Sequence, residues 1–150
     1  MSFQEIKIVR ANGKMKDVWL EMRLKLWPNH TAIVHEQEIE NILKKHNEVA
    51  FLAFSDHKPV GFVECSIRKI AEGCDTNNIG YIEGWFVDEI LRRQGLGRKL
   101  VQVAEDWAKM KKCKEIASDC EYHNEISQKA HIALGYKETN RLIHFKKSLQ

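Results

Sequence analysis

"EGWFVDEILRRQGLGRKLVQVAEDWAK", residues 83–109, is the stretch of sequence that decides the fold. It begins inside the apolar run "IGYIEGWFVD" (79–88), which is typical of a buried strand, and Gly84 within that run favours a β-bulge. From Gly97 onward, apolar residues recur at helical spacing and predict a helix with one buried face. Its apolar positions are Leu100, Val101, Ala104, Trp107 and Ala108.

Between the strand and the helix lie two glycines among arginines. Gly95 and Gly97 come directly before the helix, where free backbone N–H groups and the positive end of the dipole gather. Glycines let a ligand approach the backbone closely, and Arg92, Arg93 and Arg98 add positive charge. Together these features predict a pyrophosphate cradle.

The spacing excludes two better-known phosphate loops. No Lys-Ser/Thr pair follows the second glycine, as a Walker loop requires, and the third glycine of the dinucleotide fingerprint is missing. From spacing alone, a flexible turn on a solvated basic surface remains the alternative.

Outside this stretch the hydrophobic pattern alternates between strand and helix periods. Near the N-terminus it predicts a strand in "FQEIKIVRA" (3–11) and a helix in "MKDVWLEMRLKLWP" (15–28) that Pro28 ends. A second helix is expected in "HEQEIENILKKH" (35–46), where the early glutamates suit a helix N-terminus. These are Glu36, Glu38 and Glu40, which either add an acidic field or lie on a solvated face.

The remaining elements complete the predicted order βααβββαβαβ(β), a mixed α/β (α+β) architecture with both hairpins and crossovers. A helix with Gly135 at its C-cap is expected late in the chain, followed by one or two closing strands. The segments concerned are the strands "VAFLAFS" (49–55), "VGFVECSIRKI" (60–70) and "EIASDC" (115–120), the helix "NEISQKAHIAL" (124–134), and "YKETNRLIHFKKSL" (136–149).

Bulk composition narrows the class of protein. The 150 residues fit one domain, 1–150, with 43% apolar and 30% charged residues. The net charge of +3 arises from charges of both signs and does not imply a nucleic-acid partner. No signal-peptide core or membrane-length apolar run is visible, which predicts a cytoplasmic protein. The four cysteines and seven histidines lack ligand spacing, so no metal is expected.

The segment Arg92-Arg93-Gln94-Gly95-Leu96-Gly97 resembles the acyl-coenzyme A signature of the GNAT family of N-acetyltransferases, Arg/Gln-x-x-Gly-x-Gly/Ala. This resemblance implies a helix-flanked mixed sheet that splays into a V between its fourth and fifth strands, with acetyl-coenzyme A (acetyl-CoA) in the opening. Six blocks in order further resemble the aminoglycoside 6'-N-acetyltransferases of antibiotic resistance. They are "MRLKLWPNH", "YIEGWFV", "LRRQGLG", "EIASDC", "HNEISQKAHIALGYKET" and "IHFKK".

The resemblance implies direct acetyl transfer to the 6'-amine in a ternary complex, and a homodimer with the closing strands near its interface. For the cofactor, it implies that the strand backbone pairs with the pantetheine amides and that the N–H of Val87 faces the thioester oxygen. Asn124 matches the family asparagine on the pantetheine arm, although it could equally be only a helix N-cap. The expected cofactor-binding residues are Trp85, Phe86, Val87, Arg92, Arg93, Gln94, Gly95, Leu96, Gly97, Arg98 and Asn124.

For the acceptor, carboxylates on both walls of the cleft would hold a polycationic amine. Glu83 resembles the glutamate of the subgroup's Glu-Gly pair, and Asp119 ends the strand on the other wall. An amine has a pKa well above neutrality, so a base or a shifted amine is needed. We expect Glu83 to act as a water-mediated base and Asp119 to position the amine, while surface or capping roles remain the alternatives. By resemblance, Trp27, His30 and Tyr136 join the acceptor wall, unless Trp27 is simply core packing.

His131 stands where many family members carry a tyrosine that protonates the leaving thiolate. A histidine titrates near neutrality and could do the same, or it could be a packed helix residue. Two rival functions stay open at this stage. One is acetylation of another amine, such as a protein N-terminus, a lysine, a polyamine or a metabolite. The other is a non-catalytic acyl-CoA sensor.

Overall fold

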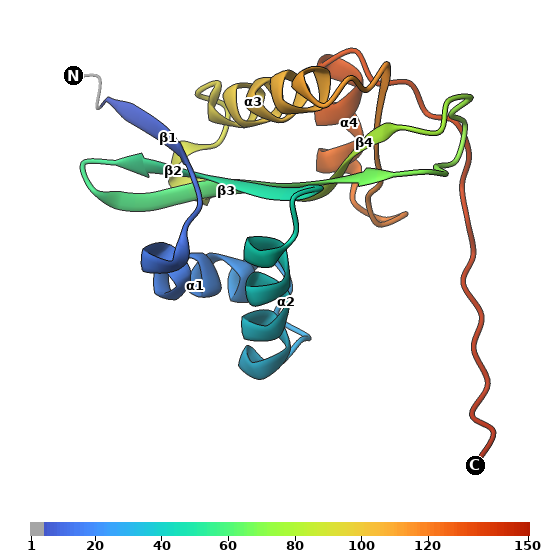
Figure 1. Cartoon of the computed structure of the whole chain (residues 1–150), viewed down its shortest axis with the longest axis horizontal. Coiled ribbons are helices and arrows are strands. Elements are labelled where there is room, and N and C mark those ends of the chain that lie inside the picture. The colour runs from blue at the N-terminus through green and yellow to red at the C-terminus, as the bar shows by residue number, and fades with distance from the viewer. Residues whose placement is uncertain (1–4) are drawn as a thin grey trace.

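The computed structural model describes residues 5–150 and has a central sheet with helices on both faces (Figure 1). The elements follow the predicted order as far as the last helix. They are β1 (Ile6–Arg10), η1 (Gly13–Met15), α1 (Lys16–Leu26), α2 (Ala32–Lys44), β2 (Glu48–Ser55), β3 (Lys58–Arg68), β4 (Ile79–Val87), η2 (Glu89–Leu91), α3 (Leu96–Met110), β5 (Glu115–Ser118) and α4 (Glu125–Ala133).

The five strands form one sheet in the order β1-β2-β3-β4-β5. The first four pair antiparallel, and β5 lies parallel to β4. Asp56 and His57 make the tight turn between β2 and β3, and both have positive φ, 48° and 68°. Two left-handed residues are the geometry of a type I′ hairpin turn, so the predicted hairpin is confirmed.

The sheet opens between β4 and β5. Only Ile79–Ile82 of β4 pairs with β5, through Glu115–Ser118, whereas β4 continues to Val87. Within the described chain, no strand pairs with that edge of residues 83–87. The mixed α/β fold predicted from the sequence is confirmed, with a strand edge left free where the two strands separate.

The two faces of the sheet carry different helices. In Figure 1, α1 and α2 lie on one side of the sheet, and α3 and α4 lie on the other. All five predicted core positions of α3 are buried, which confirms that helix and its buried face. Phe62 and Phe86 instead join Trp19 of α1 in the cluster on the α1–α2 side.

Two details of the N-terminal half differ from the prediction. The second helix begins at Ala32, because the Thr31 hydroxyl accepts a hydrogen bond from the Val34 N–H and caps it. Its first turn contains no acidic residue, so placing the three glutamates at the helix start was wrong. The first strand begins at Ile6, and Phe3 lies outside the described residues.

The closing strands predicted over 136–149 are absent: residues 136–150 contain neither helix nor strand. In Figure 1 this tail runs away from the body of the chain. A strand needs a neighbouring strand for its backbone groups, and here the described chain offers the tail none, although the side chains of Thr139 and Asn140 contact Glu72. Four of its apolar side chains are therefore left in solvent, with exposed fractions of 57% for Leu142, 80% for Ile143, 90% for Phe145 and 92% for Leu149.

Candidate active site

The glycine-containing loop leads into α3, and no side chain caps the start of that helix. Gly95 is the N-cap residue of α3, has φ +84°, and offers no side-chain cap. A Cβ added there would meet nothing within 4 Å, so open space lies in front of the helix N-terminus. Arg92, Arg93 and Gln94 are exposed beside it. Free N–H groups, open space and positive charge together fit a pyrophosphate.

Gly97 serves a different purpose from Gly95. A Cβ at Gly97 would lie 3.0 Å from the ring of Trp85, so the glycine lets this ring lie against the start of α3. The contact ties the loop to β4, whose residues 85–87 have one free backbone edge. Extended backbone next to a helix N-terminus suits a cofactor with amide groups and phosphates.

A β-bulge in β4 determines where Glu83 points. Glu64 pairs with Gly84 while Cys65 pairs with Ile82, so Glu83 is the extra residue. The irregularity predicted at Gly84 is therefore confirmed. Any Cβ on Gly84 would clash with the ring of Trp27, so this glycine lets Trp27 pack across the strand beside Glu83.

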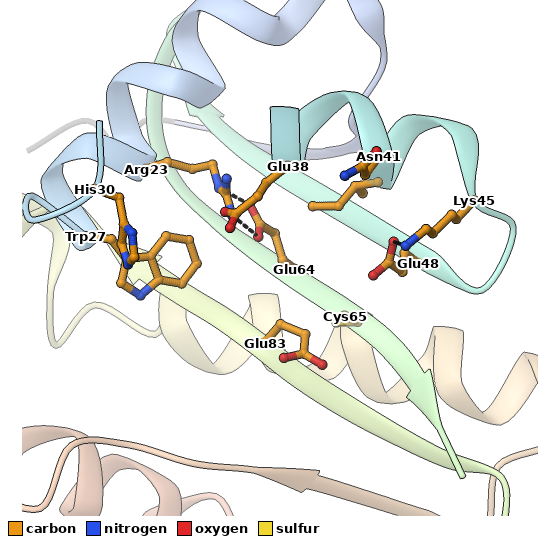
Figure 2. Close-up of a pocket in the computed structure, with 11 residues that line it drawn as sticks. Arg23, Trp27, His30, Glu38, Asn41, Lys45, Glu48, Glu64, Cys65 and Glu83 are labelled. Carbon is orange, nitrogen blue, oxygen red and sulfur yellow. Dashed lines mark hydrogen bonds and ion pairs between the residues drawn. The ribbon is translucent and has the colours of Figure 1, made fainter. Parts of the chain in front are cut away.

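A cavity of about 410 Å³ opens on the α1–α2 side of the sheet (Figure 2). In Figure 2, Trp27 and His30 stand at one end, and Lys45 and Glu48 at the other. Three predicted acceptor residues, Trp27, His30 and Glu83, meet at this cavity. The full lining is Arg23, Trp27, His30, Glu38, Asn41, Ile42, Lys45, Glu48, Glu64, Cys65 and Glu83.

A buried ion pair that the sequence analysis did not identify supports the cavity wall. Arg23 Nε lies 2.9 Å from Glu64 Oε2, and both side chains are only 3–4% exposed. Trp19 donates a 2.7 Å hydrogen bond to the same oxygen. Burial raises the pKa of Glu64, and the charge of Arg23 opposes that rise. A glutamate inside the apolar run "GFVECSI" was the available sequence clue, because burying a lone charge is costly.

The same arginine also shapes the cavity wall around Trp27. Arg23 Nη2 lies 2.7 Å from Glu38 Oε2 at the cavity mouth. Its guanidinium carbon lies 4.8 Å from the centre of the Trp27 ring, in cation–π geometry. The Trp27 carbonyl in turn contacts His35 Nε2 at 3.1 Å. Arg23 thus ties α1, α2 and β3 together around Trp27.

The two predicted acceptor carboxylates are joined by a chain of side chains. Arg68 donates to both oxygens of Glu83, from Nε at 2.8 Å and from Nη2 at 2.7 Å. The guanidinium carbon of Arg68 lies 3.5 Å from the centre of the Tyr81 ring, and the Tyr81 hydroxyl donates to Asp119. The hydrogen bond that Arg68 donates to Glu83 raises the pKa of Arg68, and burial raises the pKa of Tyr81. Asp119 is exposed and does not line the cavity itself.

The predicted residues of α4 lie where the sheet opens. His131 Nδ1 contacts the Ser127 carbonyl at 2.7 Å, and its Nε2 contacts Ser118 Oγ at 2.8 Å, at the end of β5. Since a carbonyl only accepts, Nδ1 carries the proton. The ring packs edge-on to Trp85, 5.4 Å between centroids.

Asn124 and Tyr136 do not meet the acceptor residues. The Asn124 side chain accepts a 3.0 Å hydrogen bond from the Ser127 N–H, so the expected N-cap is present. Tyr136 packs against the hydrophobic cluster on the α3 side and does not line the cavity, so the structure does not bring it to Trp27, His30 and Glu83.

Cys65 is the one buried cysteine of the four, and all four are free. Among residues 5–150, no three His, Cys, Asp or Glu side chains are grouped as a metal site would require. In the same part of the chain, every helix is too short or too polar to cross a membrane.

The family model and the curated proteins that match this chain are all acetyltransferases. The model of the acetyltransferase (GNAT) family matches residues 14–136. Proteins named aminoglycoside N(6')-acetyltransferase type 1 are similar: one from Klebsiella aerogenes is 40% identical, covering 87% of this chain and 89% of its own. Another, from Salmonella typhimurium, is 38% identical, covering 93% and 97%.

Solved structures of aminoglycoside N-acetyltransferases are similar to this chain as well. An aminoglycoside N-acetyltransferase in complex with CoA is 35% identical, with a TM-score of 0.93 and 97% of both chains covered. A structure of that enzyme type with a bisubstrate analogue, CoA-S-monomethyl-acetylneamine, has a TM-score of 0.91 at 35% identity, covering 96% of this chain and 99% of that one.

Proposed function

The chain belongs to the GNAT family of acetyltransferases, and we propose that it moves the acetyl group of acetyl-CoA to the 6'-amino group of aminoglycosides. The observation that carries this proposal is the position of Glu83. Its side chain lines the cavity on the α1–α2 side, and it begins the free edge of β4 that leads to the glycine loop. Glu83 thus lies between the cavity proposed for the acceptor and the free edge of β4 proposed for the cofactor. The amine must meet the thioester at this point.

The residues of the loop and the free edge fit acetyl-CoA, which supplies the activated acetyl group as a thioester. Backbone N–H groups of Gln94–Arg98 hold the pyrophosphate, assisted by Arg92 and Arg93. The free backbone of Trp85–Val87 pairs with the pantetheine amides, with the Val87 N–H toward the thioester oxygen. The family also carries an asparagine at the position of Asn124, which we assign to the same arm. No metal takes part in this proposal.

On the acceptor side, Trp27, His30 and Glu83 form the wall that receives the aminoglycoside. Glu83 takes the amine proton through a water molecule, and Asp119 positions the amine from the other wall, so that transfer occurs directly in the ternary complex. Tyr136 remains a proposed contributor only by resemblance, since nothing in the geometry supports it.

His131 is proposed to protonate the leaving thiolate of CoA. Once its Nε2 is protonated, it donates to Ser118 Oγ, and the Ser118 hydroxyl can pass a proton into the opening of the sheet. The packing of His131 against Trp85 at that opening supports this role.

The acceptor amine is tested with a panel of amines in a steady-state acetyl-CoA assay. Kanamycin A and tobramycin, which carry a 6'-amine, should be acetylated, and an aminoglycoside with a 6'-hydroxyl should be a poor substrate. Equal turnover of the 6'-hydroxyl compound would contradict the assigned position. Preferred turnover of a polyamine, a lysine or a protein N-terminus would support the rival acetyltransferase function, and cofactor binding without any turnover would support the sensor.

We further propose that the chain works as a homodimer in which the tail 141–149 adds to the sheet of a second copy. Four apolar side chains of the tail are exposed, and α4 has no buried residue, with Ile126 76% and Ile132 58% exposed. Beyond β4, β5 has no second strand partner in the described chain. A strand of a second copy would satisfy both the free edge and the exposed apolar groups.

This proposal predicts a dimer in sedimentation equilibrium at micromolar concentration. Phe145→Lys should shift the population toward monomer, because it places a charge in the apolar interface, whereas Lys146→Ala, on the opposite face of an extended tail, should not. A monomeric wild-type protein, or a dimer that Phe145→Lys leaves intact, would refute it. The cytoplasmic location and the single domain over 1–150 stay predictions from the sequence.

A further inference from the structure

Arg68 is a cation inside a site that is proposed to receive cations. Its guanidinium holds Glu83 through two hydrogen bonds and lies flat on Tyr81, whose hydroxyl binds Asp119. One positive charge therefore faces both carboxylates assigned to the acceptor. The hydrogen bonds to Glu83, together with the charges of Glu83 and Asp119, raise the pKa of Arg68, so the guanidinium is charged whenever these two carboxylates are.

Arg68 is not required to hold either carboxylate in place. Ser66 Oγ independently donates a 2.6 Å hydrogen bond to Glu83 Oε1, and Tyr81 independently holds Asp119. The β-bulge fixes the direction of Glu83 through the backbone. Arg68 therefore balances the negative charge of Glu83 and is not needed to orient it. Without Arg68, Glu83 would keep its direction but lose its counter-ion.

Arg68 can also leave its position. Its side chain is 41% exposed, and that of Glu83 is 34% exposed, so the pair lies at the solvent boundary. Ion pairs in such positions contribute little to stability, since water screens them and compensates both partners when they separate. By contrast, the pair of Arg23 and Glu64 on the same face of the sheet is buried and fixed.

We propose that Arg68 is a displaceable counter-cation of the acceptor site. In the empty protein its guanidinium compensates Glu83 and Asp119, and an ammonium group of the acceptor takes over that contact while Arg68 turns toward solvent. This inference rests on the proposed function in taking Glu83 as the carboxylate that meets the amine. It makes Arg68 a specificity-determining residue, because an acceptor must carry enough positive charge to replace a bidentate arginine.

The test measures equilibrium binding of kanamycin A by calorimetry, in the presence of CoA, for four proteins: wild type, Arg68→Gln, Glu83→Gln and the double variant. Arg68→Gln should bind about three- to fivefold more tightly, since it removes a competing ion pair at a partly exposed site. Glu83→Gln should bind more weakly, because it leaves Arg68 as an unpaired cation facing the ligand. The double variant should therefore bind better than Glu83→Gln alone.

A residue that only supports the structure would give the opposite pattern. Arg68→Gln would then weaken binding, and the double variant would be no better than Glu83→Gln; either result would overturn the proposal. Arg68→Lys keeps the charge but loses the bidentate contact, so its affinity should lie between those of wild type and Arg68→Gln. Arg10→Gln, on the edge strand β1 two strands away from β3, is the matched control for loss of one positive charge. Since the readout is binding, absence of turnover in the amine panel would refute the proposed function without deciding this inference.

Discussion

Glu64→Ala is expected to lower the free energy of unfolding by about 3–5 kcal/mol, the usual cost of leaving one partner of a buried ion pair without the other. Arg23 is 3% exposed, and after the change only Glu38, at the cavity mouth, would face its charge. The Trp19 N–H would lose its acceptor as well. Chemical denaturation at fixed protein concentration measures the effect.

A matched control separates burial from charge. Glu40→Ala removes the ion pair that joins Glu40 of α2 to Lys16 of α1, where the side chains are 41–43% exposed. Its denaturation midpoint should stay close to that of wild type, because exposed pairs contribute little. If Glu64→Ala were as mild as Glu40→Ala, the network around Arg23 would have to be solvated rather than buried.

A double replacement tests the cause more closely. Arg23→Met together with Glu64→Leu removes both charges and should lose less stability than Glu64→Ala, because no charge is left without a partner. The double variant should nevertheless bind kanamycin A more weakly, since Trp27 loses the guanidinium packed on its ring and Glu38 loses its ion partner. In the double variant, stability would be partly regained relative to Glu64→Ala while affinity for the acceptor would stay reduced.

The parts of the site that could be read from the sequence are those whose chemistry is local. The turn at Gly95 and the buried face of α3 follow from backbone preference and helical period over one continuous stretch, and both were predicted correctly, while the role of the loop as a pyrophosphate site stays a prediction. Glu83 was recognised because a charge inside an apolar strand needs a reason. Its direction was not predictable, since it depends on a bulge set by pairing with β3.

The parts that were missed depend on residues far apart in the chain. Arg23 and Glu64 are 41 residues apart in the sequence, and no local pattern predicts a contact between them. Arg68 and Glu83 face each other only after the β3–β4 pairing is fixed. The closing strands were predicted from alternating apolar residues, which are present. A strand also requires a neighbour, however, and the single chain supplies none for the tail.

Gly95→Val is expected to weaken binding of acetyl-CoA about a hundredfold, or about 2.7 kcal/mol. Gly95 has φ +84°, a conformation that costs a β-branched residue roughly 1–3 kcal/mol. In the free protein the loop can relax to escape this strain, but binding requires the N–H groups to face the pyrophosphate again. The valine methyl groups would also occupy the open space in front of α3, where no protein atom lies within 4 Å of the added Cβ.

Two further variants distinguish strain from obstruction. Asparagine tolerates positive φ, so Gly95→Asn removes most of the strain but keeps a side chain in the cradle; weak binding by this variant would identify obstruction as the main cause. Gly135→Val imposes a similar strain, at φ +91° and with nothing within 4 Å, but at the end of α4, outside the loop. It should cost stability while keeping the cofactor affinity. If Gly95→Val itself binds acetyl-CoA as wild type does, then residues 92–98 are not the pyrophosphate site. An anion held by that backbone could not tolerate both the strain at position 95 and a side chain in front of α3. Calorimetric titration with CoA, which needs no acceptor, gives the affinities of all three variants directly.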